Sequence, residues 1–230
     1  MKRSINTAAI AALLGLAAPS TAAKAPDTWD GLLRVKAKKV ENVYLLPNAD
    51  FRGYTKVMLE PTQVAFRKNW QRDINRGTGG FDRHVSDADA RRILDEATAG
   101  FIGDFHKAFT DAGYQIVTAP GPDVLRISTA VINLAVDAPD TMSATVTRTY
   151  TPEAGEATLV VEAEDSVTGQ ILGRAVDERV IGDAAPYLRN RASNRGDFER
   201  MFRHWAKLSA EGLGELKSLS PIDTEGQLRR

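Results

Sequence analysis

The segment 157–181 alternates apolar and polar residues on both sides of the turn sequence Asp-Ser-Val-Thr-Gly. Alternation with a period of two predicts half-buried strands, and two such strands around turn residues predict a β-hairpin. A three-residue loop over 167–169, with Gly169 in the left-handed conformation, would give a type I turn followed by a bulge. This loop would set Ser166 opposite Gln170.

The register that follows from this loop divides the hairpin side chains between two faces. Val161 falls opposite Ala175 on the apolar face, which we expect to pack on the core. Glu162 falls opposite Arg174 on the outward face, and Glu164 lies on the same side. We therefore expect these charged side chains to be solvated.

Three acidic residues of the hairpin are candidates for chemistry. Glu162 and Glu164 would suit hydrolysis as a carboxylate pair, but the register places both in solvent. Asp177 falls on the apolar face opposite Leu159. We interpret Asp177 as the end of a strand that emerges into solvent, because unpaired charge is rarely buried.

Two long helices are predicted elsewhere in the chain. The first begins with Ser86 as its N-cap and ends near Gly113, and its apolar residues recur at steps of three and four. The second covers 197–217 and has a similar apolar stripe. Gly100 and Gly103 interrupt the first helix, and we interpret them as places where it packs closely on the sheet.

The other apolar stretches predict strands, which cover residues 54–59, 64–66, 114–117, 124–136 and 142–150. Pro61 ends or borders a strand because it cannot donate to a ladder. The alternation changes phase within 124–136, which predicts a bulge or coverage on both faces. The polar, glycine-rich residues 68–83 predict a loop. This order of elements predicts an α+β fold, with an antiparallel or mixed β-sheet and two main helices packed on one face.

The first 23 residues have the pattern of a signal peptide. Lys2 and Arg3 precede an apolar run over 8–18, and Thr21-Ala22-Ala23 provides small residues at a cleavage site. The run is shorter than the ~20 residues of a membrane-spanning helix, and an uncleaved anchor is the alternative. The expected organisation is a signal peptide at 1–23, a poorly ordered N-terminal arm at 24–42, a single α+β domain at 43–219 and a flexible tail at 220–230.

Composition excludes several classes of protein. The chain has 30 basic and 30 acidic residues, and removal of Lys2 and Arg3 with the leader leaves 28 against 30. This balance argues against a nucleic-acid partner, since such proteins usually carry a strong basic excess. Cysteine is absent, which excludes disulfides, thiolate metal sites and the lipid anchor of a bacterial lipoprotein. We expect a periplasmic or secreted protein that has no transmembrane segment and no lipid anchor.

Catalytic and metal-binding motifs are not found. The histidines His84, His106 and His204 lack the i, i+4 spacing of helical metal ligands. There is no GxSxG elbow, and the glycine-rich residues 77–80 lack the Lys-Ser/Thr of a phosphate loop. The sequence therefore predicts no metal, no cofactor and no catalytic residue, while it leaves enzymatic activity open.

One polar cluster is a candidate binding site. A predicted loop after Gly182 and the start of the second helix carry five arginines, which are Arg189, Arg191, Arg195, Arg200 and Arg203. Arginines beside the N–H groups of a helix start can hold phosphate or carboxylate. The alternative is a solvated loop without a specific partner. The partner suggested by this cluster is an envelope protein or an anionic component of the envelope.

Three stretches carry a resemblance to a known family. These are the run DFRGYTKVMLEP at 50–61, the hairpin turn at 165–169, and Phe202 with Trp205-Ala206 in the second helix. Together they resemble the domain of unknown function 3313 family of exported bacterial proteins, over roughly 44–217. The resemblance implies a cell-envelope location and brings no established activity. Members of this family are often lipoproteins, and this chain departs from that pattern because it has no cysteine.

The sequence thus favours an exported cell-envelope protein that acts as a non-catalytic binding or assembly module. The alternative is a periplasmic hydrolase whose site is assembled from dispersed polar residues. The ligand, the oligomeric state and the order of the strands in the sheet are left open by the sequence.

Overall fold

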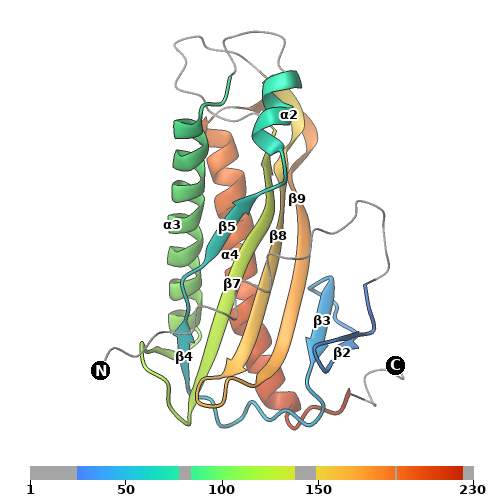
Figure 1. Cartoon of the computed structure of the whole chain (residues 1–230), viewed down its shortest axis with the longest axis vertical. Coiled ribbons are helices and arrows are strands. Elements are labelled where there is room, and N and C mark those ends of the chain that lie inside the picture. Colours follow the sequence, from blue (N-terminus) through green and yellow to red (C-terminus); the bar gives the residue numbers. More distant parts are fainter. Residues whose placement is uncertain (1–24, 78–83, 138–148, 190, 225–230) are drawn as a thin grey trace.

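The computed structural model describes residues 25–77, 84–137, 149–189 and 191–224, with the backbone alone described at 149–153, 183–189 and 191–194. This part of the chain forms one mixed sheet with two long helices side by side on one face, which confirms the α+β prediction (Figure 1). The strands are β1 (Thr28–Trp29), β2 (Leu32–Val35), β3 (Asn42–Leu45), β4 (Lys56–Leu59), β5 (Gln63–Phe66), β6 (Gln115–Ile116), β7 (Val124–Val136), β8 (Thr149–Asp165) and β9 (Ile171–Arg189). The helices are α2 (Trp70–Gly77), α3 (Asp87–Asp111) and α4 (Arg191–Leu219).

The strand order is β1-β2-β3-β9-β8-β7-β4-β6, and β5 also pairs with β7. Both β4 and β5 run parallel to β7 and are separated at Pro61, as its missing N–H predicts. The phase change predicted within β7 is a bulge, because the register with β8 shifts between Ile132 and Ala135. Asn133 takes a left-handed conformation there, with φ of 54°.

The hairpin of β8 and β9 lies at the centre of the sheet. Its pairing over 159–163 is the predicted one, and Gly169 is left-handed with φ of 72°. The predicted three-residue loop is wrong: the N–H of Asp165 donates to the carbonyl of Gln170 at 3.0 Å, so the loop holds four residues. Ser166 is therefore not paired with Gln170, and the extra residue is absorbed by a register shift after Ala163.

The two long helices run in the same direction. Phe101 of α3 meets Phe202 of α4 edge to face, with ring centroids 5.5 Å apart. Further along both helices, the Lys217 ammonium lies 5.3 Å from the centroid of the Tyr114 ring just beyond α3. Ser86 is the N-cap of α3 as predicted, whereas α4 begins at Arg191 and takes in residues that were expected to form a loop.

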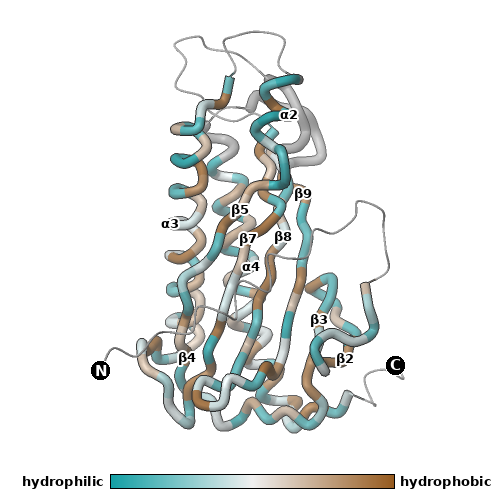
Figure 2. The backbone as a smooth tube through the Cα atoms, viewed as in Figure 1, coloured by the Kyte–Doolittle hydropathy of each residue, from teal (hydrophilic) through white to brown (hydrophobic). Residues whose placement is uncertain are grey.

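The main core lies between the sheet and these helices. Phe101, Phe105 and Phe109 line the buried side of α3, and Trp205 is 1% exposed on α4. Figure 2 shows hydrophobic residues recurring along the strands of the sheet and along α3. A second, smaller core lies under α2, where a loop had been expected. Trp70 anchors this helix, because its indole N–H donates to the Val136 carbonyl at 3.1 Å.

Asp177 is a buried carboxylate that joins three parts of the chain. Its Oδ2 accepts from Trp205 Nε1 at 2.8 Å and from Arg179 Nε at 2.7 Å. Its Oδ1 accepts from the backbone N–H of Glu41 at 3.0 Å. Asp177 is 4% exposed, so the prediction that it emerges into solvent is wrong.

The N-terminal strands cover the outward side of the hairpin. Segment 24–42 was expected to be a poorly ordered arm, but β1 and β2 extend the sheet beyond β3. Arg174 donates from Nε to Glu162 at 2.7 Å and from Nη1 to Asp30 at 2.9 Å. The Trp29 ring centroid lies 4.1 Å from the guanidinium carbon of Arg174. Glu162 and Arg174 are consequently buried, and the prediction that they are solvated is wrong.

The expected flexible tail is also partly fixed. The N–H of Ile222 donates to the Ala49 carbonyl at 2.9 Å, and the N–H of Asn48 donates to the Ile222 carbonyl at 3.0 Å. The Ile222 side chain is buried, so 220–224 belong to the domain. The predicted signal peptide, the last residues of the tail and most of the strand expected over 142–150 lie outside the described residues.

The bonds of Asp177 predict a coupled loss of stability. Asp177→Ala should lower the free energy of unfolding by about 3 kcal/mol, because it leaves buried donors without their charged acceptor. In a double-mutant cycle with Trp205→Phe, the coupling measured by urea denaturation should be about 1–2 kcal/mol. Glu178→Ala, at the exposed neighbouring position, should change stability by less than about 0.5 kcal/mol. Strictly additive effects of the two core substitutions would contradict this assignment.

Candidate functional site

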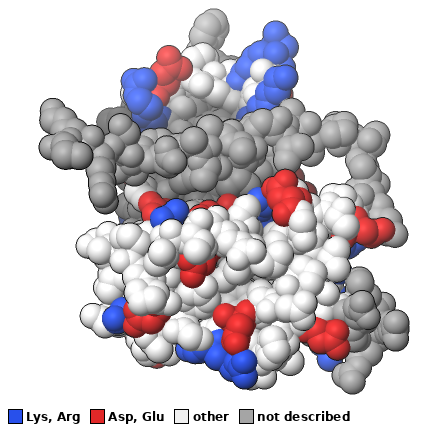
Figure 3. Space-filling view, turned by 60° about the horizontal axis from the view of Figure 1, so that its bottom comes forward, with Lys and Arg blue, Asp and Glu red and all other residues white. Residues whose placement is uncertain are grey.

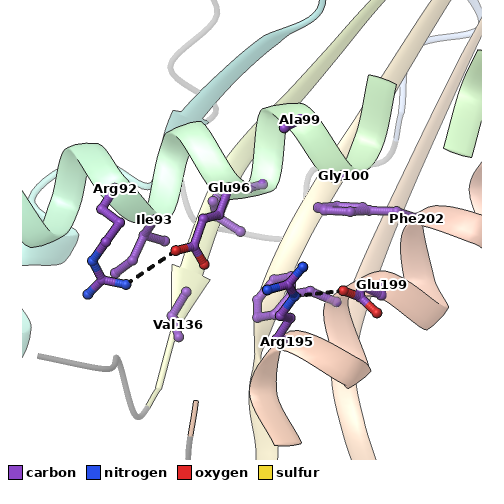
Figure 4. A pocket seen from close by; sticks show the side chains of 12 residues that line it. Arg92, Ile93, Glu96, Ala99, Gly100, Val136, Arg195, Glu199 and Phe202 are labelled. Carbon is purple, nitrogen blue, oxygen red and sulfur yellow. Dashed lines mark hydrogen bonds and ion pairs between the residues drawn. The ribbon is translucent and has the colours of Figure 1, made fainter. Parts of the chain in front are cut away.

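A hollow of about 440 Å³ lies between the N-terminal halves of α3 and α4, above the end of β7 (Figure 4). We call it the α3–α4 groove. Its floor is apolar and is formed by Leu134 and Val136 of β7, with Ile93 of α3 and Phe198 and Phe202 of α4 beside them. A cleft of this kind has the usual character of a small-molecule site, whose volume is typically about 300–1,000 Å³.

The groove exists because α3 carries small residues where it faces α4. Ala97 and Gly100 line it, and a Cβ atom built at Gly100 would meet no atom within 4 Å. A Cβ at Gly103 would also lie in open space, on an exposed part of the helix. The prediction that both glycines pack closely on the sheet is therefore wrong. At Gly100 the absence of a side chain leaves open space in the groove between α3 and α4.

Each rim of the groove carries an ion pair within one helix. On α3, Arg92 Nη1 lies 3.5 Å from Glu96 Oε1. On α4, Arg195 Nε donates to Glu199 Oε1 at 2.8 Å. Because the helices run in the same direction, both arginines lie at the end of the groove nearer the helix N-termini. The opposite end, at Gly100 and its neighbours, is apolar.

The structure distributes the five predicted arginines over three places. Arg195 lines the groove, and Arg203 Nη1 lies 3.8 Å from Glu199, which it shares with Arg195. Arg200 pairs with Asp197 instead. Arg189 ends β9 and Arg191 begins α4, and their side chains lie outside the described residues. Anion binding by this cluster stays a prediction. The three arginines whose side chains are described, Arg195, Arg200 and Arg203, each have an acidic partner in α4.

A second charged cluster lies on the sheet face away from the helices. Arg126 stands opposite Glu164 in the β7–β8 ladder, with Nη1 at 3.4 Å from Glu164 Oε2 and Nε at 3.6 Å from Glu60 Oε1. Glu164 is 4% exposed, so the prediction that it is solvated is wrong. Burial, together with the hydrogen bond and the negative charge of Glu162, raises the pKa of Glu164 to about 7.

The end of the molecule at the β8–β9 turn shows charges of both signs scattered on a largely uncharged surface (Figure 3). Neighbouring charges there form pairs, such as Asp50 with Arg52 at 2.6 Å. In the described residues, no group of three or more His, Asp or Glu side chains is placed to hold a metal ion. No helix of that same part of the chain has the length and apolar character needed to cross a membrane.

Two of the stretches that carried the family resemblance, 50–61 and 165–169, meet at this end. The Tyr54 hydroxyl donates to Asp165 of the hairpin turn at 2.8 Å, and Lys217 of α4 donates to the Tyr54 carbonyl at 2.8 Å. The model of the family described as Protein of unknown function (DUF3313) matches residues 27–209. The chain belongs to this family. No curated protein matches it.

Several solved structures resemble the chain in fold. A DUF330 family protein from Xanthomonas campestris is 15% identical, with 76% of this chain and 91% of that chain covered and a TM-score of 0.39. The PelC dodecamer from Paraburkholderia phytofirmans is 11% identical, with coverages of 70% and 95% and a TM-score of 0.30. A DUF4136 family protein from Bacteroides thetaiotaomicron is 9% identical, with coverages of 84% and 99% and a TM-score of 0.31.

The α3–α4 groove was missed by sequence reasoning. Its floor residues belong to ordinary apolar stripes, and such stripes do not reveal where two helices part. The one signal in the sequence was Gly100, because a glycine inside a helix costs roughly 1 kcal/mol and needs a reason. The burial of Glu162 left no signal in the hairpin itself, because Trp29 and Asp30, which cover its partner Arg174, come from β1 and the turn after it.

The raised pKa of Glu164 predicts a dependence of stability on pH. The folded state holds this proton more tightly than the unfolded state, whose value is the ordinary 4.5. The stabilising contribution is therefore fully present below pH 4.5 and is lost as the pH rises through about 7. Glu164→Gln should remove this loss, and its advantage over the wild type should grow to at most about 3 kcal/mol at alkaline pH.

Urea denaturation at a series of pH values measures this difference directly. The matched control is Glu178→Gln, at an exposed glutamate of β9, which should follow the wild-type profile. A constant difference between Glu164→Gln and the wild type at all pH values would contradict the prediction.

Proposed function

We propose that this chain is an exported protein of the cell envelope that acts as a non-catalytic binding module. The observation that carries the proposal is the α3–α4 groove, whose apolar floor lies between rims closed by ion pairs. An apolar cleft with a few polar groups at its edge binds through shape and burial. Arginine and glutamate side chains that are already paired with each other are able to orient a ligand, but they are poorly suited to act as a general acid or base.

The leader at 1–23 supports export, and the membership in the family fits an envelope protein. Without cysteine, the mature chain would be held in the envelope by its contacts and not by a lipid. The proposed partner is an envelope protein or an anionic envelope component. The proposed anion contact consists of Arg189, Arg191, Arg195, Arg200 and Arg203.

A hydrolase is less well supported by the arrangement of carboxylates. Glu162 and Glu164 are neighbouring carboxyls, one with a raised pKa, as a general acid requires. However, each is 4% exposed and each contacts an arginine, Arg174 or Arg126. A substrate would have to displace these contacts to reach the pair, so the geometry favours a structural role.

Export predicts a defined start of the mature protein. After fractionation of cells, the protein should be found in the periplasm, and its N-terminal sequence should begin at Lys24 because signal peptidase reads the small residues before it. An Ala23→Asp variant should block cleavage and serves as the control. Full-length wild-type protein in the membrane pellet would contradict export by this route.

The binding function itself is tested by purification from the native envelope under mild conditions, followed by mass spectrometry of both proteins and small molecules. A component that follows the wild type and is lost on Gly100→Leu supports the proposal. A protein that comes free of any component and hydrolyses a generic ester or glycoside overturns it in favour of the hydrolase.

A further inference from the structure

We propose that the α3–α4 groove holds the hydrocarbon chain of an anionic amphiphile, with the carboxylate or phosphate head at Arg92 and Arg195. This inference rests on the proposed binding function and names the chemistry of its ligand. Three features of the groove support it: the apolar floor, the placement of the arginines and the open space at Gly100.

The floor of the groove excludes a polar ligand body. Leu134 and Val136 present only hydrocarbon, and Phe198 and Phe202 present aromatic rings along the side of α4. A sugar or peptide laid on this surface would lose hydrogen bonds to water without replacement, which is costly. A hydrocarbon chain makes no hydrogen bonds to water, and its transfer from water to an apolar surface lowers the free energy.

The two arginines give the groove a direction. Arg92 and Arg195 come from opposite rims, and both belong to the first turns of helices that run in the same direction. The positive ends of both helix dipoles add to their charge there. Guanidinium groups bind carboxylate and phosphate in bidentate geometry, so an anionic head fits this end and the chain extends toward Gly100.

The present partners of the arginines do not prevent this binding. The side chains of Arg195 and Glu199 are 65% and 39% exposed. Arg92 is 25% exposed, and besides its pair with Glu96 it lies 3.3 Å from the buried carboxylate of Asp89. Ion pairs at exposed positions contribute little to stability and rearrange readily. An anionic head is therefore able to share the Arg195 guanidinium with Glu199, while Arg92, held by Asp89 and Glu96, adds positive charge on the opposite rim.

The width at Gly100 provides the first test. Titration calorimetry of delipidated protein with dodecanoate and with dodecyl phosphate should show saturable binding at one site, and a preference between the two probes distinguishes a fatty acid from a phosphorylated amphiphile. Gly100→Leu should abolish binding, because its side chain would occupy the open space in the groove. Gly103→Leu adds the same side chain at an exposed position outside the groove and should bind as the wild type does.

Both leucine variants should raise the thermal midpoint, since leucine favours the helix more than glycine. A loss of binding by Gly100→Leu alone then cannot be ascribed to misfolding.

The arginines provide the second test. Arg195→Gln should weaken binding of both anionic probes about tenfold, which corresponds to the loss of a charged hydrogen bond. It should leave the binding of uncharged decanol unchanged. Lys207→Gln is the matched control, because Lys207 lies on the same helix, is 72% exposed, has an i,i+4 ion pair with Glu211 as Arg195 has with Glu199, and does not line the groove. It should change neither affinity.

Two results would overturn the inference. The first is the absence of saturable binding of either anion by the wild type. The second is equal binding by the wild type and Gly100→Leu, which would place the amphiphile elsewhere on the protein. Because this experiment uses purified protein, it fails or succeeds independently of the fractionation that tests export.

Discussion

The fold depends on the single carboxylate of Asp177, which joins the central hairpin to the segment before β3 and to α4. A buried charge is tolerated only where its partners are complete, so the three parts must be placed together. Trp205, which donates to Asp177, also stacks against Phe202 with ring centroids 6.3 Å apart. Phe202 lines the α3–α4 groove, and the position of one groove wall is therefore set by a hydrogen bond on the sheet.

The sheet has a second buried face that is held together by charge. Trp29 and Asp30 close over Arg174, which neutralises Glu162, while Arg126 lies against Glu164. The face toward α3 and α4 is apolar, and the sheet and the helices are held together there by burial of hydrocarbon. The sheet thus has an apolar face toward the helices and a charged face on the other side. The predicted pH dependence of stability comes from Glu164 on the charged face.

Sequence patterns predicted the elements that are set by local chemistry. Period-two alternation gave the pairing of Glu162 with Arg174, and the Ser86 cap gave the start of α3. Patterns failed where segments distant in the chain decide the burial of a residue. The Glu162–Arg174 pair has the same sequence whether it is solvated or buried, and it is buried here because Trp29 lies over Arg174. The groove at Gly100 was missed for a similar reason, because one helix does not specify its separation from another.

The pairing of β3 with β9 has a consequence for the order of folding. These strands are more than a hundred residues apart in the chain, and Ile222 bonds to Ala49 across a still longer separation. Contacts between such distant segments close large loops, which makes folding slow and late. The part of the sheet that contains β1, β2 and β3 cannot join the rest before β9 has been synthesised, so the sheet stays incomplete until late in synthesis. Until the chain is complete, it therefore lacks a fully folded sheet and is still able to pass through a narrow channel as an extended polypeptide.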